Sequence, residues 1–141
     1  MERLQGIVPI ARKAALITLI EGNSTAIEVV DQVRSLIQAE ETVMVILDSN
    51  HTRQHVLDEL VAYSDLVTTG SYIVATDGSM KDFHDVPRGS SDWQWNNPSA
   101  AAAEFAERHP EFALEQPPWD FNESELTDNI THWSGGWLRR R

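Results

Sequence analysis

Apolar residues follow two patterns along the first half of the chain: short unbroken runs and helical spacing. Runs at 15–20 and 43–47 have the length of buried strands, and each is followed by polar turn residues. Between them, residues 24–38 carry apolar side chains every three or four positions, which predicts an amphipathic helix. Its expected apolar face comprises Ile27, Val30, Val33, Leu36 and Ile37.

The helix over 24–38 also carries a start signal. Thr25 lies three residues before Glu28, the spacing of a capping box in which each side chain bonds the other residue's backbone N–H. A second helix is predicted from Thr52 to about residue 67, again because apolar residues share one stripe. That stripe is expected to comprise Val56, Leu57, Leu60, Val61 and Leu66.

A further apolar run, SYIVATDG, predicts a strand that ends at Asp77. Strands and helices that alternate in this order, with connections of this length, predict parallel strands joined by right-handed βαβ units. The predicted fold class is therefore α/β, in a single domain over 1–141.

Residues 78–98 show no periodicity and are predicted to form a long loop. Within it, Trp93 and Trp95 are candidates either for a cover over a substrate or for ordinary packing. A helix is expected to begin near Pro98 and to stop before Pro110.

The C-terminal part is predicted to return to strand. EFALEQ should place Phe112 and Leu114 on one face. The closing ELTDNITHWSGGWLRRR is expected to be a strand turned at SGG into a short returning arm, because adjacent glycines supply the positive φ angles of tight turns.

The amino-acid composition excludes or disfavours several classes of partner and of site. The net charge of -11 over 141 residues disfavours nucleic acid as a partner, because DNA and RNA reward basic surfaces. The three terminal arginines form the only basic cluster and are expected to be solvated. The absence of cysteine excludes disulfides, zinc thiolate sites and cysteine nucleophiles, and favours a cytoplasmic location. We identify no signal peptide and no membrane-spanning run.

Polar residues gather directly after the run at 43–47. The segment LDSNHTRQH places Asp48, Asn50, His51 and His55 at the end of a predicted buried strand. In open parallel sheets, ligands bind where strands end and loops begin, so this is the predicted functional site. His51 beside a strand-end acid is a candidate general base for a substrate hydroxyl, and a loop-tethering hydrogen bond is the equal alternative.

His51 and His55 are four residues apart, which on a helix would place both imidazoles on one face, as in some zinc sites. The predicted helix begins only at Thr52, so the pair need not converge. A chance pair of surface histidines is the favoured interpretation.

These segments, in this order, resemble the C-terminal portion of the cephalosporin hydroxylase and rhamnosyl O-methyltransferase family. The similarity runs from about Ile17 to the end and is carried by VMVILDSNHTRQHVLDELVAYSDLVTTGSYIVATD, NNPSAAAAEF, HPEFALE and NITHWSGGWLRR. The resemblance implies a partial Rossmann-like fold of the class I S-adenosylmethionine-dependent methyltransferase type. Its sheet would be mostly parallel with an antiparallel C-terminal strand or hairpin, and would lack the first two βα units.

The resemblance also implies a divalent metal site, usually read as magnesium, built from acids at two adjacent strand ends. Its ligands in this chain would be Asp77, Asn50 and Asp48. Two of the three carboxylates expected of the family are replaced, because Asn50 and Thr76 stand at those positions. His51 and Asp48 are the predicted catalytic residues.

The segment EGNST corresponds to a family loop beside the adenine of S-adenosylmethionine, which implies cofactor contacts from Gly22, Asn23 and Ser24. A turn that merely caps a helix is the favoured alternative. The glycine-rich turn that normally approaches this cofactor is absent from the sequence. Without the two missing strands, residues 1–22 are expected to slide against the run at 43–47, to pair with another chain or to attach loosely.

The leading functional prediction is methyl transfer from S-adenosylmethionine to a hydroxyl of a small molecule, sugar or lipid. The alternative is a non-catalytic truncated remnant or partner subunit of such an enzyme. A metal-dependent hydrolase built on DSNH and the two histidines is a third and less complete interpretation, because no second acidic cluster accompanies them. A homo-oligomer and a companion chain are both open as partners.

Overall fold

The computed structural model describes residues 16–118, 125, 127 and 131–141. It contains helices α2 (Ile27–Leu36), α3 (Arg53–Tyr63) and α4 (Pro98–Arg108), and strands β1 (Val45–Leu47), β2 (Tyr72–Ala75), β3 (Phe112–Leu114) and β4 (Trp137–Arg140). Short 3-10 helices occupy Ser64–Leu66, Gly78–Phe83 and Ser91–Gln94. Within these described ranges, no helix has the length and apolar character needed to cross a membrane.

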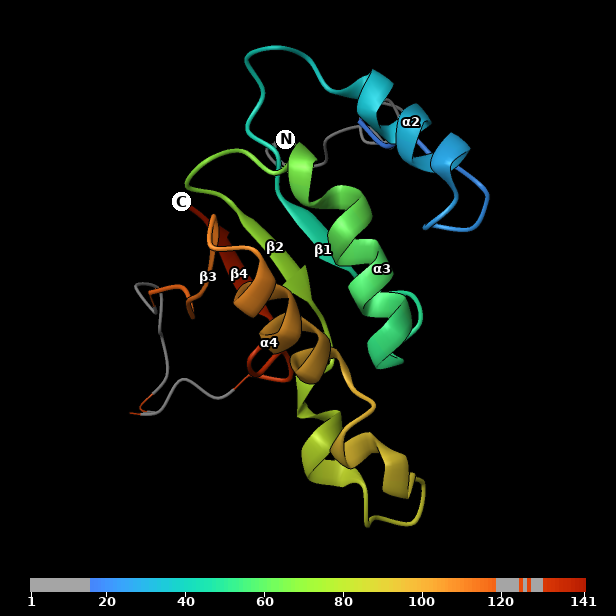
Figure 1. Cartoon of the computed structure of the whole chain (residues 1–141), viewed down its shortest axis with the longest axis vertical. Helices are drawn as coiled ribbons and strands as arrows, with labels where there is room; N and C mark the ends of the chain where they lie inside the picture. Colours follow the sequence, from blue (N-terminus) through green and yellow to red (C-terminus); the bar gives the residue numbers. More distant parts are fainter. Residues whose placement is uncertain (1–15, 119–124, 126, 128–130) are drawn as a thin grey trace, which may run out of the picture.

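The four strands form one sheet in the order β1-β2-β4-β3. β1 and β2 are parallel, with Ile46 opposite Val74, and β4 runs antiparallel to both of its neighbours. The predicted mixed α/β sheet with an antiparallel C-terminal strand is confirmed at this level. In Figure 1, α3 and α4 lie over the sheet, and α2 lies beyond α3. The parallel pair brings the carboxyl ends of β1 and β2 to the same edge.

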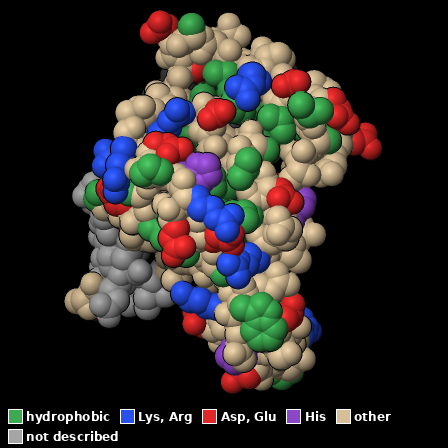
Figure 2. Space-filling view, in the orientation of Figure 1, with side chains coloured by type: hydrophobic (Ala, Val, Ile, Leu, Met, Phe, Trp, Pro, Cys, Tyr) green, Lys and Arg blue, Asp and Glu red, His purple; other side chains and the backbone are tan. Residues whose placement is uncertain are grey.

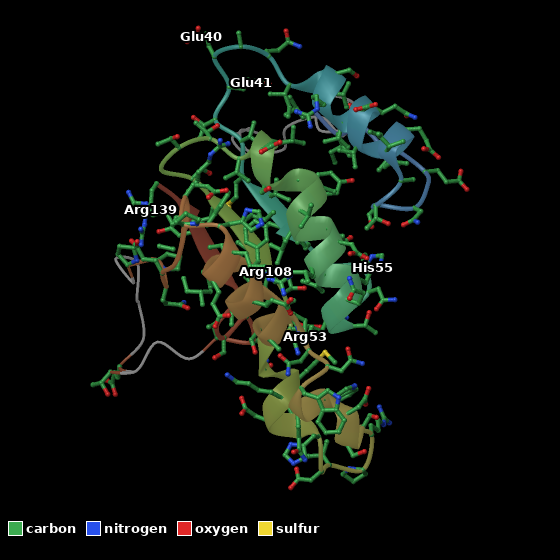
Figure 3. All side chains as sticks on the ribbon, in the orientation of Figure 1. Glu40, Glu41, Arg53, His55, Arg108 and Arg139 are labelled. Atoms are coloured by element: carbon green, nitrogen blue, oxygen red, sulfur yellow. The ribbon has the colours of Figure 1, made fainter. Side chains whose placement is uncertain are left out.

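The core lies between the sheet and the helices α3 and α4. Leu60, Ile73, Phe105 and Leu138 are fully buried, and removal of such apolar area from water is the main stabilising contribution. At the surface, Glu104 joins the two helices, because each of its oxygens lies 2.6 Å from an arginine, Arg53 on α3 and Arg108 on α4 (Figure 3).

The predicted buried strand at 15–20 is wrong over its described residues. Residues 17–20 have no regular structure, and the side chains of Leu16 and Leu19 are exposed. The apolar composition of this segment favoured a buried strand. A segment is buried only where another element packs against it, and no strand among the described residues pairs with this one. Ala15 lies outside the described residues, and the mode of attachment of residues 1–22 stays a prediction.

β1, predicted to be a buried strand, lies at the edge of the described sheet and is only partly buried. Leu47 points into the core and is 6% exposed, whereas Ile46 is 53% exposed. The apolar run alone could not show that the face of the strand that carries Ile46 lacks a covering element.

The capping box predicted for α2 is wrong. Ala26 occupies the cap position and its side chain makes no capping hydrogen bond. Thr25 instead donates from its hydroxyl and its N–H to Asn23 Oδ1, at 3.0 and 3.2 Å, because an asparagine side chain competes well for nearby backbone donors. Of the predicted apolar face, Ile27 and Leu36 are exposed and Val30 is buried.

The start of α4 confirms its prediction. Asn97 Oδ1 accepts a hydrogen bond from the Ala100 N–H at 2.9 Å, and Pro98 occupies the first turn. The helix ends at Arg108. In the following strand Phe112 is buried but Leu114 is exposed, so the predicted shared face of β3 is only partly correct.

The SGG segment turns the chain into β4. Gly135 has a φ of +67°, and a Cβ on Gly136 would lie 1.9 Å from the Ala75 carbonyl oxygen, so both glycines are needed for this close passage. β4 then inserts between β2 and β3. Residues 128–130, part of the first arm of the predicted hairpin, lie outside the described residues.

The terminal arginines are anchored, which corrects the expectation of a solvated end. Arg140 Nη1 donates to the Val67 carbonyl at 2.6 Å, and Arg139 pairs with Glu115 at 3.2 Å. Arg141 donates to the Pro110 carbonyl at 3.3 Å. The aliphatic part of an arginine side chain can cover apolar surface while its N–H groups donate to carbonyls. The number of charged residues in the sequence does not reveal such contacts.

Residues 78–98, predicted as a loop, contain the two later 3-10 helices. In Figure 1 this segment extends beyond the carboxyl ends of β1 and β2. Trp95 is 58% exposed and Trp93 is half-buried. The role of the pair as a substrate cover stays a prediction.

Candidate active site

The carboxyl ends of β1 and β2 bring Asp48, His51 and Asp77 together. His51 Nε2 lies 3.4 Å from Asp48 Oδ1 and 3.3 Å from Asp77 Oδ2. One ligand atom from each residue lies within 4.8 Å of the other two. We call these three residues the strand-end cluster. Sequence reasoning placed all three at neighbouring strand ends, and the parallel pairing of β1 with β2 gives the physical reason for their proximity.

Thr76 fixes the Asp48 side of the cluster. Its hydroxyl lies 2.7 Å from Asp48 Oδ1 and 2.9 Å from the Leu47 carbonyl oxygen, and the residue is buried. The hydrogen bond from Thr76 lowers the pKa of Asp48, and the contact with His51 lowers it further. Asp48 is therefore held as a carboxylate.

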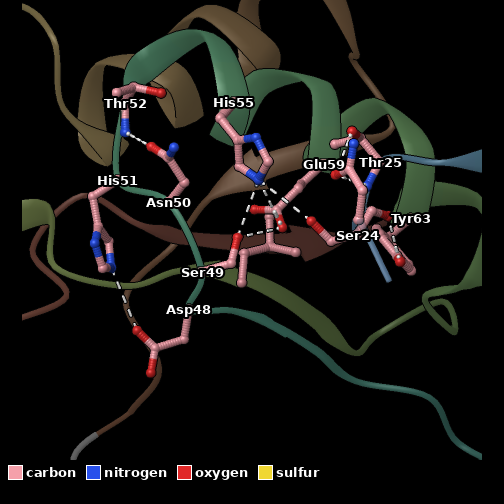
Figure 4. A network of polar contacts seen from close by, with 12 residues as sticks. Ser24, Thr25, Asp48, Ser49, Asn50, His51, Thr52, His55, Glu59 and Tyr63 are labelled. Atoms are coloured by element: carbon pink, nitrogen blue, oxygen red, sulfur yellow. Dashed lines mark hydrogen bonds and ion pairs between the residues drawn. The ribbon is translucent and has the colours of Figure 1, made fainter. Parts of the chain in front are cut away.

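His51 is oriented by the two carboxylates. Because Nε2 faces both acids, it is the nitrogen suited to carry the hydrogen, which leaves Nδ1 as the atom with the free lone pair. The side chain is 27% exposed, so it is reachable from solvent. Figure 4 shows the imidazole directed toward Asp48 from the loop that precedes α3. This arrangement can hold a proton taken from a neighbouring hydroxyl.

Asn50 is not brought into the strand-end cluster. Its Oδ1 accepts a hydrogen bond from the Thr52 N–H at 2.9 Å (Figure 4), a short turn that starts α3. Figure 4 shows this amide, a predicted metal ligand, turned toward the start of α3 and away from Asp48.

A second polar network lies beside the cluster. His55 Nε2 lies 3.1 Å from Ser49 Oγ, 3.3 Å from Ser24 Oγ and 3.4 Å from Glu59 Oε1. Ser49 also donates to Glu59 Oε1 at 2.7 Å. His51 and His55 therefore serve different networks, and they do not converge as a zinc pair. One nitrogen of His55 faces the serines and the acid alike, so this is not the relay of a serine hydrolase, in which the two nitrogens face different partners.

Glu59 is the functional candidate that sequence reasoning missed. It is 2% exposed, and its Oε2 has no hydrogen-bond partner. The spacing of residues in α3 indicates that Glu59 is buried. Positions 56, 59, 60 and 63 form one helical stripe, and the residues at 56, 60 and 63 are apolar or aromatic. The prediction that Val61 lies on the apolar stripe is wrong, because its side chain is 58% exposed.

The turn at Gly22, Asn23 and Ser24 lies beside the second network. Gly22 has a φ of +155°, and a Cβ there would lie 2.6 Å from Val29 Cγ2. Tyr63 donates from its hydroxyl to the Ser24 carbonyl at 2.7 Å (Figure 4). Burial, and then the charge of Glu59, raise the pKa of Tyr63, so the donor proton is retained.

A cavity of about 360 Å³ connects this turn to the strand-end cluster. We call it the β1 cavity; it is lined by Ser24, Val45, Ile46, Leu47, Asp48, Ser49, Glu59 and Tyr63. It thus joins one residue predicted to contact a cofactor, Ser24, to one predicted to be catalytic, Asp48. A separate cavity of about 420 Å³ follows Asp77 along the chain and is lined by Ser79, Asp82, Phe83, Gln116, Thr131, His132 and Ser134.

Comparison with known proteins identifies the family. The model of the rhamnosyl O-methyltransferase/CmcI family matches residues 7–141. The chain belongs to this family. No curated protein and no solved structure matches it. The family resemblance seen in the sequence is confirmed, and its name supports O-methyl transfer as the type of reaction.

In this member of the rhamnosyl O-methyltransferase/CmcI family, the predicted site residues fall into three groups. Asp48, His51 and Asp77 meet at the strand ends. The turn residues Gly22, Asn23 and Ser24 form the second group, of which Ser24 lines the β1 cavity. Asn50 serves as a helix-start residue instead.

Proposed function

We propose that this chain is an S-adenosylmethionine-dependent O-methyltransferase that acts on a hydroxyl of a small molecule, with the strand-end cluster as its active site. The observation that carries the proposal is His51, held between the carboxylates of Asp48 and Asp77 at 3.4 and 3.3 Å in a family of O-methyltransferases. The strand order also agrees with the C-terminal part of a class I methyltransferase sheet, in which an antiparallel strand is inserted near one end.

His51 is the proposed general base. An acceptor hydroxyl beside Nδ1 would lose its proton to that nitrogen as its oxygen bonds the methyl carbon and the sulfur–carbon bond of the cofactor breaks, with S-adenosylhomocysteine as the leaving group. The positive charge that develops on the imidazole would be stabilised by Asp48 and Asp77, which face Nε2. Thr76 supports the reaction indirectly, because it holds Asp48 ionised. When bound, S-adenosylmethionine supplies a methyl group on a sulfonium, which makes that carbon electrophilic.

The cofactor would contact the turn at Gly22, Asn23 and Ser24 and the mouth of the β1 cavity. The Ser24 hydroxyl lines that cavity, whose volume lies within the range of small-molecule sites. Asn23 Oδ1 accepts two hydrogen bonds from Thr25, so the amide NH2 group of Asn23 is the donor that would face the cofactor. These residues fit part of the cofactor. The sequence holds no glycine-rich turn to approach the remainder.

The strand-end cluster does not fit magnesium well. Mg²⁺ is a hard cation that prefers oxygen ligands, whereas in the cluster the Nε2 atom of His51 lies between the two carboxylates. The amide oxygen of Asn50 is used by the Thr52 N–H. We therefore assign the proton transfer to His51 and derive no step through a metal.

The cavity that follows Asp77 is the proposed acceptor site. Hydroxyl, carboxylate and imidazole groups line it together with one phenyl ring, Phe83. Several polar groups around an apolar ring suit an acceptor that carries hydroxyls, such as a sugar.

A transfer assay tests this function. The full chain is incubated with S-adenosylmethionine carrying a labelled methyl group and a panel of hydroxylated small molecules, and labelled products are sought by mass spectrometry. We expect labelled ether products, at least about a hundredfold less of them with His51→Gln, and no change with the matched variant His109→Gln at the far end of α4. Equal activity in both variants would remove His51 from the mechanism.

A further inference from the structure

Another cavity, of about 310 Å³, is formed by α3, by α4 and by the segment that leads into α4. Its lining residues are Arg53, Gln54, Leu57, Trp95, Asn96 and Glu104. All of these residues, and their neighbours in the chain, belong to the part that the structure describes. We call it the α3–α4 cavity. It shares no lining residue with the β1 cavity or with the cavity that follows Asp77, so it is a separate candidate site.

Hydrogen bonds between separate segments hold the polar walls of the α3–α4 cavity in place. Asn96 Oδ1 accepts a hydrogen bond from the Arg53 N–H at 2.8 Å, and the Asn96 amide NH2 group donates to Asp92 at 2.8 Å. On the other side, Glu104 Oε2 accepts from Arg53 Nε at 3.0 Å and from Arg53 Nη2 at 2.6 Å. The cavity is therefore pre-formed, and a ligand that binds there has little side-chain ordering to offset.

Two polar atoms of the α3–α4 cavity stay available to a ligand. Gln54 donates from Nε2 to Asp58 at 2.9 Å, and its Oε1 accepts no hydrogen bond from any described residue. Arg53 directs Nε and Nη2 to Glu104, which leaves Nη1 as a donor. Because Glu104 balances the charge of Arg53 at 2.6 Å, the cavity favours an uncharged ligand that can both donate and accept hydrogen bonds.

An indole ring forms the apolar wall of the same cavity. Trp95 is 58% exposed, although tryptophan is mostly buried in folded proteins. Its backbone N–H donates to the Asp92 carbonyl at 3.0 Å, which fixes the residue at the end of its 3-10 helix. An open aromatic face beside one donor and one acceptor suits a ring with apolar C–H bonds on its faces and hydroxyls around its rim. A pyranose sugar has this distribution of groups.

We propose that the α3–α4 cavity binds a neutral sugar ring, stacked on Trp95 and hydrogen-bonded through its hydroxyls to Gln54 Oε1 and Arg53 Nη1. Figure 3 shows Arg53 between the starts of α3 and α4. Arg53 follows His51 by two residues, so their Cα atoms lie at most about 7 Å apart. The sugar site is thus a neighbour of the candidate active site, outside both of its cavities. Binding there needs neither the cofactor nor methyl transfer, so either proposal can fail without the other.

Indole N–H signals in proton–nitrogen correlation NMR spectra test the proposal on the full chain without S-adenosylmethionine. The signal of Trp95 is the one that disappears in Trp95→Phe. The probes are the methyl glycosides of glucose, galactose and mannose, with cyclohexanol and phenol for comparison. We expect a saturable shift of the Trp95 signal with at least one glycoside, with a dissociation constant on the order of 1 mM, and binding of cyclohexanol and phenol at least about tenfold weaker.

The comparison probes and the sugars give opposite outcomes if the proposal is wrong. A Trp95 signal that does not move with any of the glycosides would overturn it. Binding of cyclohexanol as tight as that of the best glycoside would show that the hydroxyls are not recognised. Tighter binding of phenol would assign the cavity to aromatic ligands instead.

Variants assign the binding to Trp95 and Gln54, with saturation-transfer NMR on the glycoside as the readout. Trp95→Leu removes the ring and should weaken binding about tenfold, whereas Trp95→Phe keeps an aromatic face and should retain most of it. Gln54→Ala should weaken binding about fivefold. Gln32→Ala makes the same change on the exposed surface of α2 and should have no effect. Equal binding by the two Trp95 variants, or by the two glutamine variants, would contradict the proposed contacts.

Discussion

The hydroxyl of Thr76, at the end of β2, donates a hydrogen bond to the Asp48 carboxylate, at the end of β1, across 2.7 Å. The same hydroxyl lies 2.9 Å from the Leu47 carbonyl oxygen. One buried side chain thus ties two parallel strand ends together and sets the charge of an acid that faces His51. Local strand pairing and the chemistry of the candidate site are linked at this residue.

Thr76→Val should raise the pKa of Asp48 toward its ordinary value, because the largest cause of the lowered pKa is the hydrogen bond from Thr76. A carboxyl whose folded pKa is lowered stabilises the fold above its unfolded pKa, and that stability is lost as the pH falls through the folded pKa. The stability difference between wild type and variant should therefore shrink on acidification. Carbon-detected NMR titration of Asp48 measures the pKa, and Thr76→Ser should retain the low value. An unchanged pKa in Thr76→Val would contradict the assignment.

Leu60→Ala should lower the free energy of unfolding by about 2–5 kcal/mol, because it leaves a cavity in the core. Leu60 is fully buried, whereas its neighbour Val61 is 58% exposed. Val61→Ala is therefore the matched control and should change the stability by less than about 0.5 kcal/mol. Urea denaturation followed by circular dichroism measures both. Similar losses in the two variants would mean that α3 is rotated relative to the sheet.

Tyr63→Phe should loosen the turn at Gly22, Asn23 and Ser24, because it removes the hydrogen bond to the Ser24 carbonyl. A loss of about 1 kcal/mol is expected for one such bond. Amide hydrogen exchange should accelerate in residues 22–26 and remain unchanged in α4. Since the pKa of Tyr63 is raised, its contribution to stability is complete below the unfolded pKa and should disappear as the pH rises through the folded value. Unaltered exchange in the turn would show that other contacts hold it.

The helices and the parallel pair could be predicted from the sequence because apolar spacing reports which face of an element is buried. Such spacing says nothing about whether a neighbour exists. The run at 15–20 has the composition of a strand, yet Leu16 and Leu19 are exposed, and Ile46 is exposed on a strand expected to be covered. Whether a segment is buried depends on both the segment and the element that packs against it. The errors at 15–20 and at Ile46 therefore have the same cause.

The candidate site was partly predictable for a similar reason. Parallel strands end at one edge, so the proximity of Asp48 and Asp77 follows from the order of the elements, while their chemical roles stay predictions. Asn50 was a candidate ligand from its type, but its amide oxygen is taken by the Thr52 N–H. Glu59 was overlooked because acids are seldom fully buried. Its place within an apolar helical stripe was the available signal.

Calorimetric titration of the full chain with S-adenosylmethionine tests the proposed function most directly. We predict saturable heat from one site. Asp48→Asn should weaken this binding, because the residue lines the mouth of the β1 cavity, and Asp58→Asn, on the exposed face of α3, should leave it unchanged. A flat titration of a chain that is well folded by circular dichroism would contradict an S-adenosylmethionine-dependent function.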